Sequence, residues 1–129
     1  MPFFAHSFAV PLLPPSVNHY KRPRLNHDLT RGFYVTAEAK AFIEAVCILS
    51  GRQPIAGRFY EVSIEYHIPQ NQFLRCDVDN FSKVACDALT ESGLIQDDRY
   101  ISDLHLVKRL AQEPQDARTV YLVKGREQL

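Results

Sequence analysis

The chain has 129 residues, a formal net charge of +0 and a hydrophobic fraction of 46%. This length fits one domain and excludes a second full one, and the hydrophobic fraction is normal for a globular core. The neutral total argues against a strongly basic nucleic-acid binder, and no apolar run is long enough to span a bilayer.

The distribution of charges and cysteines adds two expectations. Residues 1–58 hold seven Lys and Arg residues against three acids, whereas the remainder is rich in acids. The basic part could contact a phosphate backbone, and the acidic part could hold a metal. The three cysteines form no CxxC pair, and the first residues do not resemble a signal peptide, so a reducing, cytoplasmic setting is expected.

The first predicted elements are a strand and a long loop. Residues 4–10 alternate and contain Phe, Ala and Val, which predicts a strand that the following prolines end. Residues 16–34 predict a loop, and a loop this long in a small domain is typically functional or mobile. Its basic side chains are either solvated or in contact with phosphates. The candidates are Lys21, Arg22, Arg24 and Arg31.

A helix and a strand follow the loop. Residues 36–51 place apolar side chains at helical spacing, with Thr36 as the N-cap and Gly51 as the stop. Residues 58–69 alternate and predict a strand that Pro69 ends. The residues expected on one face of this strand are Phe59, Val62, Ile64, Tyr66 and Ile68.

A second helix and two strands complete the predicted fold. Residues 70–76 predict a connector that is extended at its end, and residues 79–93 predict a helix that Asp79 caps and Gly93 ends. The core stripe of this helix is Phe81, Val84, Ala85, Ala88 and Leu89. Residues 100–110 and 117–125 predict two more strands. The expected fold is α/β (α+β), one domain over residues 1–129, with a small mixed sheet of about four strands and two helices in the order β-α-β-α-β-β.

The aspartates between positions 77 and 98 suggest a functional site. Asp77 and Asp79 are two residues apart, so both side chains leave on the same side if the chain is extended there. Lys83 and Asp87 follow Asp79 at helical spacing and share one line of the helix. The aspartates at 97–98 precede a strand that could lie beside this helix. Chain geometry therefore allows Asp77, Asp79 and one of the later pair to converge.

Such a cluster would suit a divalent cation. Three carboxylates repel one another and stay ionised only beside positive charge. Mg²⁺ takes oxygen ligands and keeps several waters, and Lys83 would face the same place. These parts fit phosphodiester hydrolysis, in which a metal activates water and a lysine offsets charge on the phosphate. The alternative is structural, with Asp79 as a cap, Lys83 and Asp87 in a surface ion-pair ladder, and the later aspartates in a turn.

Four segments together resemble the RusA-type Holliday junction resolvases, endodeoxyribonucleases often carried by phages and prophages. The segments are "PPSVNHYKR", "YVTAEAKAF", "CDVDNFSKVACDALTESGLIQDD" and "ISDLHLVKR", within residues 14–109. The composite D-x-D-N-x-x-K-x-x-x-D-x-L…G…D-D is far more specific than any of its parts. The resemblance implies a Mg²⁺-dependent homodimer, with Mn²⁺ as an alternative metal, that makes paired nicks in four-way junctions or other branched DNA.

The resemblance also implies roles for single residues. The residues that match the family's catalytic set are Asp77, Asp79, Lys83 and Asp98. The three aspartates of this set would hold the metal, and the lysine would be essential. Asn80 would orient the site or touch DNA, and Asp87 and Asp97 would be supporting or structural acids.

One stretch departs from the family pattern. The type member carries a run of arginines before the first aspartate, whereas this chain has "NQFLR", in which Arg75 is retained as a candidate DNA contact. The departure and the neutral net charge point to weaker affinity for junction DNA. Two alternatives to a junction nuclease stay open: a non-catalytic module that binds branched DNA, and a nuclease that acts on another structured nucleic acid.

Overall fold

The computed structural model describes residues 4–25 and 31–129, and it gives the backbone alone at positions 22, 24 and 31–34. A four-stranded sheet forms the centre, in the order β1-β6-β4-β5. Its strands are β1 (Ala5–Val10), β4 (Phe59–Pro69), β5 (Ile101–Ala111) and β6 (Arg118–Arg126). Strands β4 and β5 are parallel, and the other two pairs are antiparallel.

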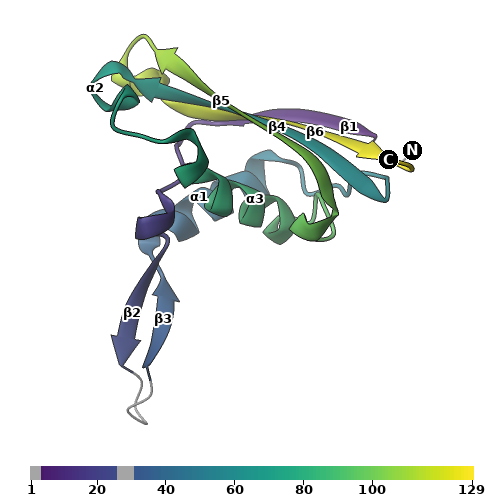
Figure 1. The fold of residues 1–129 in the computed structure, drawn as a ribbon, viewed down its shortest axis with the longest axis horizontal. Helices are drawn as coiled ribbons and strands as arrows, with labels where there is room; N and C mark the ends of the chain where they lie inside the picture. The colour runs from purple at the N-terminus through teal and green to yellow at the C-terminus, as the bar shows by residue number, and fades with distance from the viewer. Residues whose placement is uncertain (1–3, 26–30) are drawn as a thin grey trace.

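Two main helices, α1 (Ala37–Leu49) and α3 (Ser82–Glu91), cover one face of this sheet (Figure 1). The predicted α+β class, with a mixed four-stranded sheet and two helices, is confirmed. Shorter elements connect the large ones and carry much of the candidate site. They are the helix α2 (Gln70–Phe73) and the 3₁₀ turns η1 (Val17–His19), η2 (Val78–Phe81), η3 (Asp98–Tyr100) and η4 (Pro114–Asp116).

Strand β4 shows how the sheet buries one face. Its side chains alternate between buried and half-exposed, as expected for a period of two residues. The buried ones are Tyr60, Val62, Ile64, Tyr66 and Ile68. The prediction that Phe59 belongs to this face is wrong, because the same period leads from Val62 back to Tyr60 and leaves Phe59 on the opposite face.

The start of α1 and the ends of both helices agree with the prediction. The Thr36 side chain accepts a hydrogen bond from the Ala39 amide at 3.3 Å, as an N-cap does. Gly51 and Gly93 follow α1 and α3 with φ of 81° and 82°, a left-handed conformation that glycine adopts without steric cost. The predicted core stripe of α3 is buried in full: Phe81, Val84, Ala85, Ala88 and Leu89.

The predicted loop at 16–34 contains a β-hairpin. Strand β2 (Lys21–Leu25) pairs antiparallel with β3 (Arg31–Val35), and the hairpin projects away from the body of the molecule (Figure 1). Residues 26–30 of that prediction lie outside the described residues. The prediction missed the hairpin because its strands have no alternating apolar pattern, and β2 contains Pro23, which weakens a strand signal.

The connector after β4 also differs from its prediction. It begins as the short helix α2, and η2 separates it from α3, which begins at Ser82. Asp79 lies within η2, so the prediction that Asp79 caps the second helix is wrong. A 3₁₀ turn of four residues leaves no periodicity that could separate it from the helix that follows.

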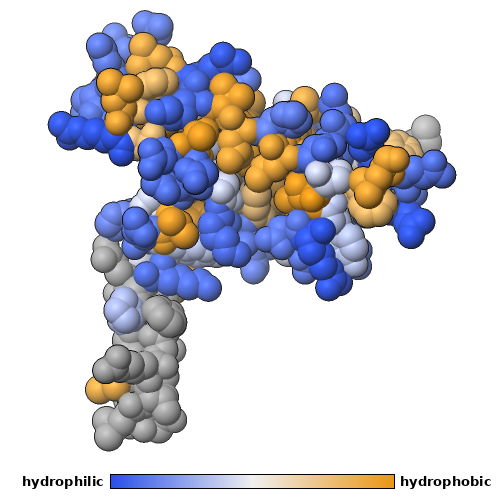
Figure 2. Space-filling model, in the orientation of Figure 1, coloured by the Kyte–Doolittle hydropathy of each residue, from blue (hydrophilic) through white to orange (hydrophobic). Residues whose placement is uncertain are grey.

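Some apolar side chains remain on the surface. In the view of Figure 2, hydrophobic side chains gather over the sheet among hydrophilic ones. Leu104 and Leu110 of β5, an edge strand, are partly exposed, and so are Ile48 and Leu49 at the end of α1. In the described part of the chain, no helix is long and apolar enough to cross a membrane.

Candidate active site

Helix α3 and the turns around it border a cavity of about 390 Å³. The helix supplies Lys83 and Asp87, which lie one turn apart on the same side. The segment that leads into η3 supplies two aspartates, and the base of the hairpin supplies an aromatic ring and a lysine. The lining residues are Tyr20, Lys21, Val35, Lys83, Asp87, Thr90, Glu91, Asp97 and Asp98.

Asp87 connects two of these elements. Its carboxylate accepts a hydrogen bond from the Tyr20 hydroxyl at 2.8 Å and another from Lys83 Nζ at 3.1 Å. The bond to Asp87 raises the pKa of the Lys83 ammonium, so Lys83 stays charged. Burial, followed by the bond to Asp87, raises the pKa of the Tyr20 hydroxyl, which therefore stays a neutral donor. Lys83 is 55% exposed, so its charge is held in place and still reaches solvent.

Asp97 and Asp98 shift each other's pKa in opposite directions. The Asp97 carboxylate caps η3 by accepting from the Arg99 amide at 3.0 Å, and this bond lowers the pKa of Asp97. The hydrogen bond with Asp97 raises the pKa of Asp98, burial adds to the rise, and the Lys83 charge opposes it. The cavity around Asp98 is lined by four acids and two lysines, so a bound cation would favour the ionised form of Asp98.

Asp79 lies on η2 and Asp77 directly before it, and neither lines this cavity. Asp77 has an extended backbone and precedes the turn, whereas Asp79 is inside it. The Asn80 amide donates to the Asp77 carbonyl at 3.0 Å, and the Ser82 hydroxyl donates to the Asp79 carbonyl at 2.8 Å. The premise that the chain is extended through both aspartates is therefore wrong at Asp79. The turn η2 packs against α3, β5 and η1.

The structure thus gathers some of the expected metal ligands and leaves others apart. Asp98 lies in one cavity with Lys83, Asp87 and Asp97. Within residues 4–25 and 31–129, no group of three His, Cys, Asp or Glu side chains is arranged to hold a metal ion. The donors that are present suit a hard cation such as Mg²⁺, because they are carboxylate oxygens and because the cavity lining holds four acids against two lysines.

The expected DNA contacts have different positions. Lys21 lines the cavity, with its Nζ 5.3 Å from the centroid of the Tyr20 ring. Arg75 is exposed after α2, and Asn80 is half-buried in η2. The other expected contacts have side chains outside what the structure describes: Arg22, Arg24 and Arg31.

Sequence reasoning missed the role of Tyr20. The Lys83–Asp87 pair could be expected from its spacing of four residues, but Tyr20 meets Asp87 across 67 positions of sequence. The one available signal was its place between His19 and Lys21, in a basic stretch with aromatic residues. That signal indicates a functional segment and does not name a partner.

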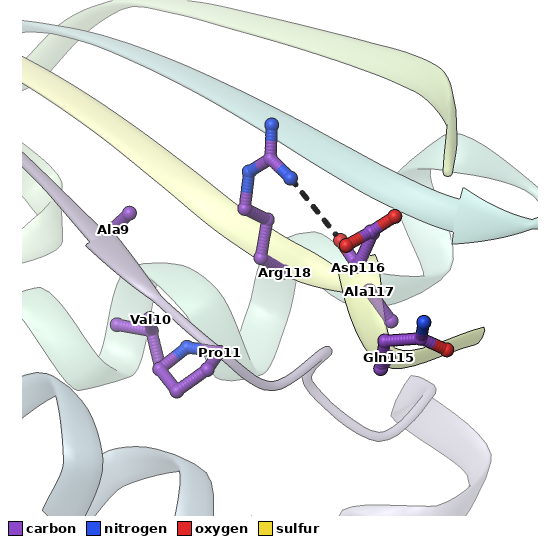
Figure 3. A pocket seen from close by; sticks show the side chains of 7 residues that line it. All are labelled: Ala9, Val10, Pro11, Gln115, Asp116, Ala117 and Arg118. Atoms are coloured by element: carbon purple, nitrogen blue, oxygen red, sulfur yellow. Dashed lines mark hydrogen bonds between the residues drawn. The ribbon is translucent and has the colours of Figure 1, made fainter. Parts of the chain in front are cut away.

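A second hollow, of about 270 Å³, lies between the end of β1 and the start of β6 (Figure 3). One carboxylate residue, Asp116, is part of its lining, and the backbone carbonyl of Asp116 accepts from Arg118 at 3.3 Å. A single acid beside an arginine does not suit a divalent cation. The cavity beside α3 is therefore the better candidate for the site.

Known proteins similar to this chain point to one family. The family described as Endodeoxyribonuclease RusA matches residues 14–118. The chain is 36% identical over 98 residues to "Crossover junction endodeoxyribonuclease rusA" of Enterobacteria phage 82, a match that covers 74% of this chain and 76% of that protein. It is 37% identical, with the same coverage, to "Crossover junction endodeoxyribonuclease RusA" of Escherichia coli (strain K12). The match to the family over most of the chain, and the identity to these relatives, place this chain in the RusA family of endodeoxyribonucleases.

Proposed function

We propose that this protein is a metal-dependent endodeoxyribonuclease that resolves four-way DNA junctions and other branched DNA by paired, symmetric nicks, in recombination and repair. The observation that carries the proposal is the cavity beside α3, where Lys83 and Asp98 lie together in a member of the RusA family. Relatives named crossover junction endodeoxyribonuclease support the choice of substrate.

The proposed metal ligands are Asp77, Asp79 and Asp98, with Mg²⁺ as the metal and Mn²⁺ as the alternative. A bound divalent ion would supply an activated water and positive charge beside the scissile phosphate. The surplus of acids over lysines in the cavity lining around Asp98 supports this assignment. For all three aspartates to hold one ion, η2 and η3 would have to draw closer than they are in this structure when metal and DNA bind.

The protein's own groups have distinct tasks in this proposal. Lys83, held at 3.1 Å by Asp87, keeps its proton and offsets charge that develops on the phosphate. Asp87 orients that ammonium, and Asp97 holds η3 through its bond to the Arg99 amide. The proposed phosphate or DNA contacts are Lys21, Arg22, Arg24, Arg31, Arg75 and Asn80.

Symmetric nicking needs two equivalent active sites, so the proposal includes a homodimer with two-fold symmetry. The base of the hairpin and the apolar end of α1, where Ile48 and Leu49 are exposed, are candidate contact surfaces. A single domain over residues 1–129 belongs to the same proposal. So does a cytoplasmic location, which the three free cysteines and a DNA substrate support.

The test is cleavage of a labelled mobile four-way junction beside a linear duplex of the same sequence. Each substrate is incubated with wild type or Asp79→Asn, in Mg²⁺ and in EDTA. The proposal predicts paired nicks at symmetric positions on the junction, which need the metal and disappear in the variant. Equal cleavage of the linear duplex, or junction cleavage by Asp79→Asn at the wild-type rate, would refute it.

A second candidate is a non-catalytic module that binds branched DNA. One observation favours it: in the described part of the chain, no three acidic side chains are grouped for a metal. Junction binding without nicks in either Mg²⁺ or Mn²⁺ would support this module. Nicks on flaps or RNA–DNA hybrids, with none on four-way junctions, would instead support a nuclease for another structured nucleic acid.

A further inference from the structure

One side chain fastens the turn that leads into Asp77. Lys108, half-buried on β5, donates hydrogen bonds from Nζ to two backbone carbonyls, those of Phe73 at 2.7 Å and Cys76 at 2.9 Å. The same ammonium lies 4.4 Å from the centroid of the Phe73 ring. These contacts join the two ends of the turn between α2 and η2 to the sheet.

The backbone of Lys108 is held in the sheet. In the parallel register of β4 and β5, Lys108 lies opposite Tyr66, so its backbone belongs to the paired part of the sheet. Tyr66 is fully buried. The two residues between the acceptors, Leu74 and Arg75, project into solvent, and Leu74 is 91% exposed. At the two ends of the turn, Phe73 and Cys76 pack against the core, and the bonds from Lys108 hold their carbonyls to β5.

The contact with Cys76 acts directly on Asp77. The Cys76 carbonyl and the Asp77 amide belong to one planar peptide group. A hydrogen bond that fixes the carbonyl therefore also fixes the direction of the Asp77 N–H. On the other side of Asp77, the Asn80 amide holds the Asp77 carbonyl at 3.0 Å. Both peptide groups that flank Asp77 are thus held, and the first of them depends on Lys108.

We propose that Lys108 is a positioning residue for the nuclease reaction, which sets the direction of the Asp77 carboxylate by clamping the Phe73–Cys76 turn to β5. The inference rests on the proposed function, because Asp77 acts as a metal ligand only there. Lys108 does not touch the substrate in this account. It acts through the backbone of Cys76. Its loss should therefore change the Mg²⁺ dependence of nicking, while junction binding persists.

The test compares Lys108→Met, which keeps the length of the side chain and removes its charge and donors, with wild type. Lys124→Met, at an exposed lysine on β6 of the same sheet, is the matched control. We expect Lys108→Met to lower the junction nicking rate by about tenfold to a hundredfold and to raise the Mg²⁺ concentration at half-maximal rate. Junction affinity in Ca²⁺ should change less than twofold. Lys124→Met should match wild type in all three measurements.

Two further variants show whether a lower rate comes from the lost hydrogen bonds or from unfolding of the protein. Lys108→Arg keeps charge and donors, and Lys108→Gln keeps donors without charge, so both should fold and both should recover part of the rate. The inference is overturned if Lys108→Met, or Lys108→Leu where the methionine variant does not fold, nicks with the wild-type rate and Mg²⁺ dependence, because neither side chain has a donor. It is also overturned if loss of rate accompanies an equal loss of junction binding, because that result describes a purely structural role.

Asp77→Asn in the same assay separates this inference from the proposed function. If Asp77→Asn nicks like wild type, the proposed metal site is wrong, whatever Lys108 does. If Asp77→Asn is inactive and Lys108→Met behaves like wild type, the metal site stands and the role of Lys108 is refuted.

Discussion

At the scale of single residues, Asp87 determines where the charge of Lys83 lies. The pair is 3.1 Å apart and partly exposed, so on a helix surface it contributes only about 0.5 kcal/mol to stability. The pair instead fixes the position of the Lys83 ammonium. Tyr20 bonds the second oxygen of the Asp87 carboxylate and so limits its rotation. A ladder that also includes Asp79 does not form, because α3 begins only at Ser82.

This arrangement predicts different effects for changes at Asp87 and at its partner Tyr20. Asp87→Ala frees the Lys83 ammonium and should lower the junction nicking rate by about tenfold. Tyr20→Phe leaves the ion pair intact, so it should lower the free energy of unfolding by about 1 kcal/mol and change the nicking rate little. Single-turnover nicking and urea unfolding of both variants measure these effects. Wild-type nicking by Asp87→Ala would contradict the orienting role.

At the scale of elements, two buried tyrosines hold α3 against the sheet in different ways. The Tyr121 hydroxyl on β6 donates to the Ala85 carbonyl of α3 at 3.0 Å. The Tyr66 ring on β4 lies 5.0 Å from the ring of Phe81, centroid to centroid, at the start of the helix. The Tyr66 hydroxyl is buried, and no described residue accepts or donates a hydrogen bond there. Burial raises the pKa of both hydroxyls, so both stay neutral.

Removing one hydroxyl at a time tests this difference. Tyr121→Phe loses a formed hydrogen bond and should lower the free energy of unfolding by about 1 kcal/mol. Tyr66→Phe loses only the cost of burying an unpaired hydroxyl, so stability should stay the same or rise by up to about 1 kcal/mol. Urea unfolding with equal m-values for wild type and both variants provides the comparison. A larger loss for Tyr66→Phe than for Tyr121→Phe would show that Tyr66 has a partner in solution.

The elements also show what a sequence can predict. The strands of the main sheet and both long helices were predictable because burial imposes a period of two on strands such as β4 and of 3.6 on helices such as α3. The hairpin was not, because its strands pair through the backbone and bury little. The spacing of four between Lys83 and Asp87 predicted their contact, whereas the Tyr20–Asp87 and Lys108–Cys76 contacts depend on how distant elements pack.

At the scale of the whole molecule, the net charge is zero, but the basic and acidic residues lie in different regions. Seven of the lysines and arginines fall in the first 58 residues, and several of them lie on or beside the projecting hairpin (Figure 1). The acids of the candidate site lie on η2, α3 and around η3. A molecule built in this way could attract DNA with one region and hold a cation with another.

The salt dependence of junction binding tests this division. Lys21→Ala and Arg75→Ala should each weaken binding in Ca²⁺ and reduce the slope of log K against log[salt] by about 1, because each removes one phosphate contact. Lys124→Ala, at an exposed lysine of β6, serves as the control and should leave the slope unchanged. Equal slopes for all four proteins would exclude Lys21 and Arg75 from the DNA-contacting surface.

In the proposed function, Asp77, Asp79 and Asp98 hold one divalent ion although η2 and η3 position them separately. The most direct measurement is Mn²⁺ binding, followed by electron paramagnetic resonance, in wild type and in Asp77→Asn, Asp79→Asn and Asp98→Asn, each with and without junction DNA. Asp103→Asn, at a half-exposed acid of β5 that pairs with Arg126, is the control. The account predicts that each of the three variants loses Mn²⁺ affinity in the presence of the junction, while the control binds like wild type. Wild-type Mn²⁺ affinity in any of the three would contradict a shared site.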